Sequence, residues 1–230
     1  MSSSDYSPLH QRILRNFISQ LNEREGEDSP FVLKGGNSLI QCYGLNRLSG
    51  DIDLDAAHEE SNRRRFLSAV KAICSKNGWE YRIAKDTDTV GRVLIHYSTD
   101  EAPLKVEVSY RNRNIPENTI ANVNGIHVYN IDRLAQMKCA AYSNRDRVRD
   151  LVDLCFIYQQ YKDQLSDVTK QTMKTTLEYK GLDQVEYLLA TQHEDVPYDD
   201  DKVIDLFLNT CDGLGLIEDR PSTYKERPAI

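Results

Sequence analysis

An alternating run of acidic and apolar residues, Asp51-Ile-Asp-Leu-Asp55, constrains the fold of this chain more than any other feature. Successive side chains of a β-strand point to opposite faces, so Ile52 and Leu54 would enter a core together. Asp51 and Asp53 would then project together from the other face. The run therefore predicts a strand that is buried on one side and carries carboxylates on the other.

Two carboxylates on one strand face repel each other unless a cation lies between them. Oxygen ligands of this kind suit Mg²⁺ or Mn²⁺. A further carboxylate, Glu107, lies in the alternating run Lys105-Val-Glu-Val-Ser109. Asp51, Asp53 and Glu107 are therefore the candidate metal ligands, and solvent-exposed strand edges are the alternative interpretation. Asp55 lies further along its strand, so we expect it at the margin of the site or on the surface.

Two glycines, Gly35 and Gly36, follow the short apolar run Phe31-Val-Leu33 and precede a helical pattern. Glycines at this place let backbone N–H groups approach a phosphate closely, and the N-terminus of the helix is positive. Asn37 and Ser38 add hydrogen-bonding side chains. All four are candidates to hold a triphosphate, although an ordinary strand-to-helix turn has the same pattern.

The remaining sequence predicts a first part that mixes strands and helices and a second part made of helices. Ser7-Pro8 is typical of a helix start, Ser61 is expected to cap a later helix, and Asn124-Gly125 predicts a hairpin turn. Periodicity places helices over residues 8–21, 37–43, 61–75, 131–143, 146–161, 166–179, 182–191 and 200–210. It places strands over residues 31–33, 51–55, 81–85, 92–97, 104–110, 120–123 and 126–129.

The strands and helices of the first part intermingle without a regular βαβ alternation. An α+β fold with a mixed sheet is therefore expected rather than a doubly wound parallel sheet. We divide the chain into an α/β domain over residues 1–130, a helical domain over residues 131–212 and an irregular tail over residues 213–230. The tail is expected because glycine and proline recur there and the periodicity fades.

Composition excludes several classes of protein. No apolar run approaches the ~20 residues that a transmembrane helix needs, and the N-terminus lacks a signal pattern. The five cysteines are scattered without a CxxC pair, which favours the reducing cytoplasm over a disulfide framework. The net charge of −7 argues against a protein that coats nucleic acid, although a local basic site remains compatible with it.

Lys138 is the candidate site residue of the helical part. It follows Leu134 by one turn, which brings it towards the apolar side of its helix. A lysine there requires a partner because burying an unpaired charge is unfavourable. Spacing alone leaves two partners open: a triphosphate, or a structural carboxylate such as Asp150 or Asp153.

These residues together resemble the AbiEii/AbiGii-type nucleotidyltransferases, a toxin-like branch of the polymerase-β-like nucleotidyltransferase superfamily. The family pattern reads L-K-G-G-T-A-L, followed by Y-G-L-x-R-x-S-x-D-I-D-L. The matching segments, which extend over about residues 31–155, are Leu33-Lys-Gly-Gly-Asn-Ser-Leu39, Tyr43-Gly-Leu, Arg47, Ser49, Asp51-Ile-Asp-Leu54, Lys105-Val-Glu107, Leu134-Ala-Gln-Met-Lys138, Arg145, Arg149-Asp150 and Asp153-Leu154. Asn37-Ser38 replaces the commoner Thr-Ala, and Glu107 stands where many relatives have Asp.

The resemblance implies a polymerase-β-like domain followed by a helical bundle. It implies metal-dependent transfer of a nucleoside monophosphate from an NTP to an acceptor, with RNA or tRNA as the expected acceptor of a toxin and an antitoxin as a possible partner. An antibiotic-type enzyme that modifies a small molecule, or a catalytically silent binding protein, is the alternative. The implied catalytic and metal residues are Asp51, Asp53 and Glu107, and the implied nucleotide-binding residues are Gly35, Gly36, Asn37, Ser38, Lys138, Asp150 and Asp153, with Lys138 also catalytic.

Overall fold

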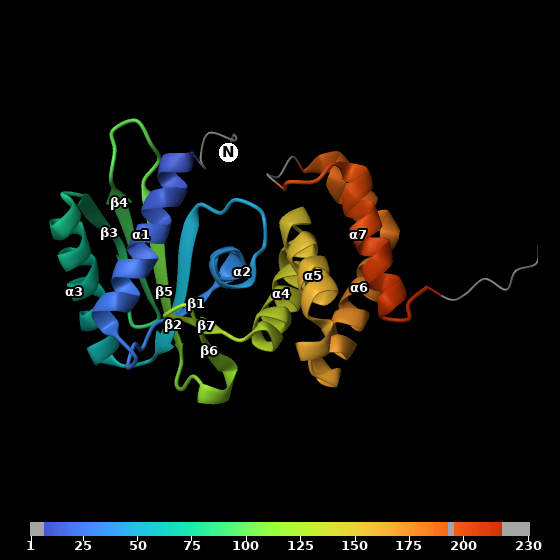
Figure 1. Ribbon diagram of the computed structural model, residues 1–230, viewed down its shortest axis with the longest axis horizontal. Helices are drawn as coiled ribbons and strands as arrows, with labels where there is room; N and C mark the ends of the chain where they lie inside the picture. Colours follow the sequence, from blue (N-terminus) through green and yellow to red (C-terminus); the bar gives the residue numbers. More distant parts are fainter. Residues whose placement is uncertain (1–6, 193–195, 218–230) are drawn as a thin grey trace, which may run out of the picture.

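A seven-stranded mixed sheet dominates the first part of the computed structural model, which describes residues 7–192 and 196–217 (Figure 1). The strand order is β3-β4-β5-β2-β1-β7-β6. β2 pairs in parallel with β5 and antiparallel with β1, so the α+β class with a mixed sheet is confirmed. The strands are β1 (Val32–Lys34), β2 (Asp51–Ala57), β3 (Glu80–Asp86), β4 (Val90–His96), β5 (Leu104–Asn112), β6 (Ile120–Val123) and β7 (Ile126–Tyr129).

Helices cover the two faces of the sheet unequally. α1 (Pro8–Glu25) and α3 (Glu60–Asn77) pack on the face that receives Ile52 and Leu54, both of which are buried. The shorter α2 (Gly35–Tyr43) lies on the opposite face, against β1, β2 and β7. The carboxylates of β2 therefore emerge on the face that carries only α2 among these helices.

The described residues of the second part of the chain are mainly helical from Ile131 to Gly213. α4 (Ile131–Arg145) follows β7 directly, and the Asn130 side chain caps it by accepting a hydrogen bond from the backbone N–H of Arg133 at 2.9 Å. Figure 1 shows these helices grouped beside α2, away from α1 and α3. The remaining helices are α5 (Val148–Tyr161), α6 (Asp167–Thr191) and α7 (Asp200–Gly213), with short 3-10 turns at Glu117–Thr119 and Lys162–Gln164.

The local turn signals are confirmed at two places. Ser7 caps α1, accepting a hydrogen bond from the backbone N–H of His10 at 3.1 Å. Asn124 and Gly125 both have positive φ, 52° and 81°, as a tight hairpin turn of this type requires. These features depend on a few neighbouring residues, which explains why the sequence predicts them well.

One expectation about helices requires correction, and a second is confirmed. α3 begins at Glu60 with Glu59 as its N-cap, so Ser61 lies inside the helix and its hydroxyl donates to the Glu59 carboxylate at 3.1 Å. The two helices expected over 166–179 and 182–191 are present as the two parts of α6, which Gly181, with its non-helical backbone (φ 65°, ψ 175°), separates. A glycine adopts this conformation at little steric cost, so the chain leaves the first helix there and enters the second.

Two further sequence expectations concern membrane-spanning helices and the C-terminal tail. Within the described residues, no helix is both long enough and apolar enough to cross a bilayer. α7 ends at Gly213, and most of the expected tail lies outside the described residues.

Candidate active site

The acidic face of β2 has the alternation that the sequence predicts. Asp51 and Asp53 are partly exposed, whereas Asp55 is buried. Lys34 of β1 forms an ion pair with Asp55, and the hydroxyl of Tyr129 donates a hydrogen bond to the same carboxylate at 2.9 Å. Asp55 is therefore a buried structural carboxylate rather than a surface residue, and Asp51 and Asp53 remain as the partly exposed pair.

The pairing of β5 with β2 brings the third candidate ligand beside this pair. Glu107 lies directly opposite Asp53, and Lys105 lies directly opposite Asp51. Lys105 forms an ion pair with Asp51, and Arg92 of β4 donates to the Glu107 carboxylate at 2.6 Å. The three carboxylates thus share one face, while two side-chain cations compensate part of their charge.

Asp53 occupies the least favourable position for a negative charge. Burial raises the pKa of its carboxyl above the ordinary value of 3.8, and the nearby carboxylate of Asp51 raises it further. Lys105 and Lys34 act in the opposite direction without cancelling these effects. A raised pKa at a carboxylate beside others is expected where a cation is needed to stabilise the ionised form.

The three carboxylates suit a hard divalent cation because they offer oxygen ligands and lie on the same face of the sheet. Asp51, Asp53 and Glu107 offer oxygen ligands from adjacent strands in register, as Mg²⁺ prefers. Across residues 7–192 and 196–217, however, no three metal-ligating side chains are drawn together into one cluster. Glu107 faces Arg92, so a metal bound by all three residues requires that contact to open.

The glycines have close-packed neighbours that explain why larger residues do not fit. A Cβ at Gly35, whose φ is 74°, would lie 2.7 Å from Asp53 Oδ2. A Cβ at Gly36 would lie 2.3 Å from Nη2 of Arg47. The first two residues of α2 therefore contact both the acidic face and a buried arginine.

The start of α2 leaves backbone N–H groups for an anion. Its N-cap residue, Lys34, makes no capping hydrogen bond with its side chain. Anions bind at such helix starts because the N–H groups point outward and the helix dipole is positive there. The backbone of Gly35 and Gly36, next to Asp53, therefore has the geometry expected of a phosphate site.

Asn37 and Ser38 do not face this opening. Both side chains are buried; Asn37 donates to the backbone carbonyl of Asp51, and Ser38 donates to that of Gly35 at 2.7 Å. The Oδ1 atom of Asn37 is buried without a hydrogen-bond partner. The two side chains hold the backbone of Gly35 and Asp51 in place, in contrast to the direct triphosphate contact expected from the sequence.

A second cluster of charges lies between α4 and α5. Lys138, only 5 % exposed, lies 3.0 Å from an oxygen of Asp150 and also forms an ion pair with Asp153. Both carboxylates are fully buried. Arg145 donates two hydrogen bonds to Asp150, at 2.6 and 2.9 Å. Of the two partners left open by the sequence, the structure therefore gives Lys138 the carboxylates.

Arg47 joins this cluster to the sheet, a role that sequence reasoning missed. Its guanidinium, in the loop before β2, donates to both oxygens of Asp153 at 2.7 and 2.8 Å. Bidentate pairs of this kind fix orientation as well as charge. We call the set Arg47, Lys138, Arg145, Asp150 and Asp153 the charge network; all of its members except the half-exposed Arg145 are buried.

The pKa of Asp150 shows that the charge network compensates its buried carboxylates. Burial alone would raise this pKa, but hydrogen bonds and charges from Arg145 and Lys138 outweigh it. The pKa of Asp150 consequently lies below its ordinary value of 3.8. The direction is opposite to that at Asp53.

The loop that precedes Asp51 is anchored by α1. His10 lies 2.9 Å from the carbonyl of Gly50, and Gln11 donates to the carbonyl of Ser49 at the same distance. A carbonyl only accepts, so His10 carries a proton on Nε2. Its Nδ1 lies 2.5 Å from the hydroxyl of Tyr97. The sequence did not predict this anchoring role, because the histidines were considered only as metal ligands and their spacing does not suit a metal site.

Comparison with known proteins agrees with the family resemblance. The family model described as "Nucleotidyl transferase AbiEii toxin, Type IV TA system" matches residues 17–212. The match includes every residue of the acidic face and of the charge network discussed above. No curated protein matches the sequence.

Solved structures support the same fold. JHP933 from Helicobacter pylori is 26 % identical with a TM-score of 0.71, and the alignment covers 92 % of this chain and 94 % of that protein. MenT4, a nucleotidyltransferase toxin from Mycobacterium tuberculosis, is 16 % identical with a TM-score of 0.55, covering 92 % of this chain and 84 % of that protein. The second likeness shows similarity of fold alone.

Proposed function

The chain belongs to the AbiEii family of nucleotidyltransferase toxins, and from that premise we propose that it transfers a nucleoside monophosphate from an NTP to the end of an RNA, with release of pyrophosphate and with tRNA as the expected acceptor. We propose further that the reaction requires Mg²⁺ or Mn²⁺. The type IV toxin–antitoxin family implies an antitoxin partner and an NTP substrate.

The pairing of Asp53 with Glu107 is the observation that carries the proposal. It sets two carboxylates of adjacent strands opposite each other, with Asp51 on the same face. Burial and Asp51 raise the pKa of Asp53, so a bound cation would stabilise its ionised form. This arrangement supports the proposal that the site binds cations.

Each residue has a separable task in the proposed reaction. Divalent metal, when bound by Asp51, Asp53 and Glu107, would neutralise phosphate charge and lower the pKa of the attacking hydroxyl. Glu107 would lie nearest the acceptor hydroxyl, and its carboxylate, once its contact with Arg92 opens, would accept the proton of that hydroxyl. Asp51 and Asp53 would act on the phosphate only through the divalent cation that they hold, because carboxylates alone repel a triphosphate.

The N–H groups of Gly35 and Gly36 are assigned to the triphosphate. The absence of a side-chain cap at the start of α2 and the contact of Gly35 with Asp53 support this position. Asn37 and Ser38 contribute by holding the two backbone segments together. The roles expected for Lys138, Asp150 and Asp153 become positioning roles, because their charges are buried and paired within the charge network.

A transfer assay tests the proposal directly. The purified protein is incubated with Mg²⁺, total tRNA and each α-labelled NTP in turn, alongside Asp53→Asn and the control Asp88→Asn, whose carboxylate is exposed and pairs with Arg63. Label in RNA with the wild type and Asp88→Asn, but not with Asp53→Asn, is expected.

Other outcomes identify a different reaction. Label on the protein itself would place the acceptor on a side chain, and no label despite binding of NTP and Mg²⁺ would favour a small-molecule acceptor. Failure to bind either NTP or Mg²⁺ would contradict a nucleotidyltransferase site at these residues.

A further inference from the structure

The face of the sheet beyond Glu107 carries no helix in the described part of the chain. β3, at the edge, is exposed along its whole length. α3 packs against β3 and β4 on the other face, where Phe66 lies against Gly91. The side of β3, β4 and β5 that continues from the carboxylates is therefore open to solvent.

Strand register arranges the side chains of this open face in two rows. One row runs from Asp53 through Glu107 and Arg92 to Lys85. The other runs from Asp51 through Lys105 and Leu94 to Arg82. Because partners in paired strands share a face, each row connects a candidate metal ligand to a cation on the edge strand.

The charge of these rows changes sign with distance from β2. Their four cations are Arg82, Lys85, Arg92 and Lys105, which we call the basic face. Glu107 is the only carboxylate of the rows on the three strands β3, β4 and β5; Glu80 lies beyond them, opposite His96. Arg92 remains 40 % exposed while it pairs with Glu107.

We propose that the basic face binds the backbone phosphates of a single-stranded RNA end whose terminal hydroxyl reaches Glu107 and Asp53. This inference rests on the proposed function, since it supplies the binding surface for the RNA acceptor. Strands lie about 4.8 Å apart, so β3 lies about 10 Å from β5. A polynucleotide whose end lies at Glu107 and that leads outward along the rows would meet Arg92 first and the β3 cations next. Lys and Arg side chains along a groove are the usual partners of such a backbone.

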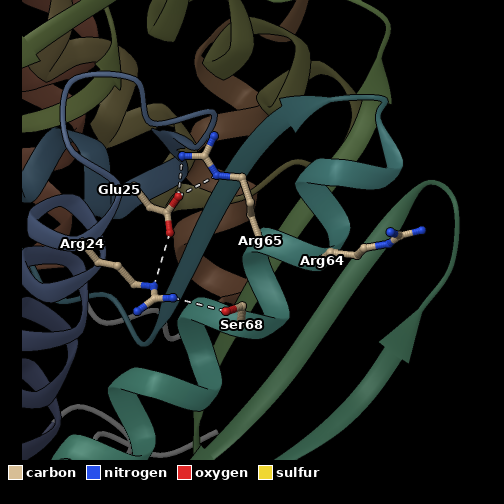
Figure 2. Close-up of a pocket in the computed structure, with 5 residues that line it drawn as sticks. All are labelled: Arg24, Glu25, Arg64, Arg65 and Ser68. Atoms are coloured by element: carbon tan, nitrogen blue, oxygen red, sulfur yellow. Dashed lines mark hydrogen bonds and ion pairs between the residues drawn. The ribbon is translucent and has the colours of Figure 1, made fainter.

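The other arginine-rich surface is a poorer match. Figure 2 shows a pocket between α1 and α3 lined by Arg24, Glu25, Arg64, Arg65 and Ser68. Arg24 and Arg65 both converge on Glu25, at 3.6 and 2.7 Å, and this carboxylate offsets their charge. The pocket belongs to the helices on the opposite face from the carboxylates, so an RNA bound there would not reach them.

Binding without turnover tests the proposal independently of transfer. The probe is a fluorescent single-stranded RNA of about 12 nucleotides, titrated by anisotropy at several salt concentrations against Asp53→Asn protein without NTP. In that background, Arg82→Ala/Lys85→Ala is compared with the matched control Arg64→Ala/Lys71→Ala on α3. Both double variants remove two exposed cations. Melting temperatures of all proteins are measured, and Lys85→Ala alone serves if the double variant fails to fold.

We expect the β3 variant to bind RNA more weakly. Its slope of log K against log salt should be shallower by about 1.4, because each phosphate that a cation neutralises on a single strand contributes about 0.7 to the slope. The α3 control should retain both affinity and slope. Equal losses in the two double variants, a larger loss in the control, or no RNA binding at low salt would overturn the proposal. RNA binding through the basic face without transfer to RNA would instead contradict the proposed function and leave this surface in place.

Discussion

The acidic face of β2 and β5 and the charge network between α4 and α5 use the same kinds of side chain with opposite results. In the charge network, two fully buried carboxylates are matched by lysine and arginine, and the pKa of Asp150 is lowered. On the acidic face, partly exposed carboxylates outnumber their cations at close range, and the pKa of Asp53 is raised. The first set is complete without a ligand, whereas the second is expected to gain from one.

This difference separates structural charges from reactive ones. Buried ion pairs are tolerated only when every charge has a partner, because the desolvation of each ion is unfavourable. A carboxylate that remains poorly compensated in the folded chain is more often part of a functional site. The following predictions change one region at a time and ask whether activity or stability responds.

Asp53→Asn should produce the largest effect on activity, a loss of about 10³-fold in nucleotide transfer, as expected for losing several kcal/mol of metal-dependent stabilisation. The melting temperature should stay the same or rise, because a repelling charge is removed. Label transfer and thermal unfolding are measured together. Addition of Mg²⁺ should raise the melting temperature of the wild type but not that of the variant. Full activity in Asp53→Asn would break the proposed distinction between the two regions.

Asp153→Ala should act mainly on stability. It leaves Arg47 and Lys138 buried without one of their carboxylates, which is expected to lower the free energy of unfolding by about 3–5 kcal/mol. Urea denaturation measures this change. NTP affinity of the protein that remains folded is measured in parallel, and a specific loss of NTP binding at unchanged stability would show that the network contacts nucleotide directly.

The adjacent glycines should respond differently to alanine. Gly36→Ala places a Cβ against the Arg47 guanidinium and should lower the free energy of unfolding by about 1–3 kcal/mol. Gly35→Ala places a Cβ against Asp53 and imposes positive φ on alanine, so transfer activity should fall by more than its stability loss of about 1 kcal/mol explains. Transfer activity per folded molecule, relative to the wild type, should therefore be lower for Gly35→Ala than for Gly36→Ala. Equal relative activities for the two variants would contradict this difference.

The pH dependence of stability should have opposite signs in the two regions. The pKa of Asp150 is lower than 3.8, so its contribution to stability is present above that value and is lost as pH falls through the folded-state pKa. The advantage of wild type over Asp150→Asn should therefore shrink in acid.

The pKa of Asp53 is higher than 3.8, so the wild type loses stability as pH rises from 3.8 through that raised value. In EDTA, Asp53→Asn should therefore gain stability relative to wild type over this window and then level off. Urea unfolding at closely spaced pH values checks both signs. If the free energy of unfolding depended on pH in the same way for the wild type and both variants, neither Asp53 nor Asp150 would have a pKa that differs between the folded and unfolded states.

Short-range features of the fold are readable from the sequence. The alternation in residues 51–55 predicts β2, and Asn124-Gly125 predicts the turn between β6 and β7. Sequence reasoning was wrong about the cap at Ser61, because an N-cap depends on where the helix begins and β2 extends to Ala57. It also gave no basis for the strand order, in which β5 lies between β4 and β2.

The candidate site also combines features that the sequence predicts with contacts that depend on strand pairing. Spacing alone predicts that Asp51 and Asp53 share a face, and the motifs around them identify the family. Spacing does not predict that Glu107 pairs in register with Asp53, nor that Arg92 contacts it. Asp55 and Lys34 were not recognised as partners, because the pairing of β1 with β2 brings them together.

By itself, the sequence determined the alternation that makes an acidic strand face, the glycines that begin α2, and membership of the AbiEii family. Tertiary structure alone decided the partner of Lys138 and the role of Arg47, which reaches Asp153 across 106 positions of the chain. The physical reason is range. Backbone preferences and side-chain alternation act between neighbours, whereas a buried charge takes its partner from whatever the packed elements bring within hydrogen-bond distance.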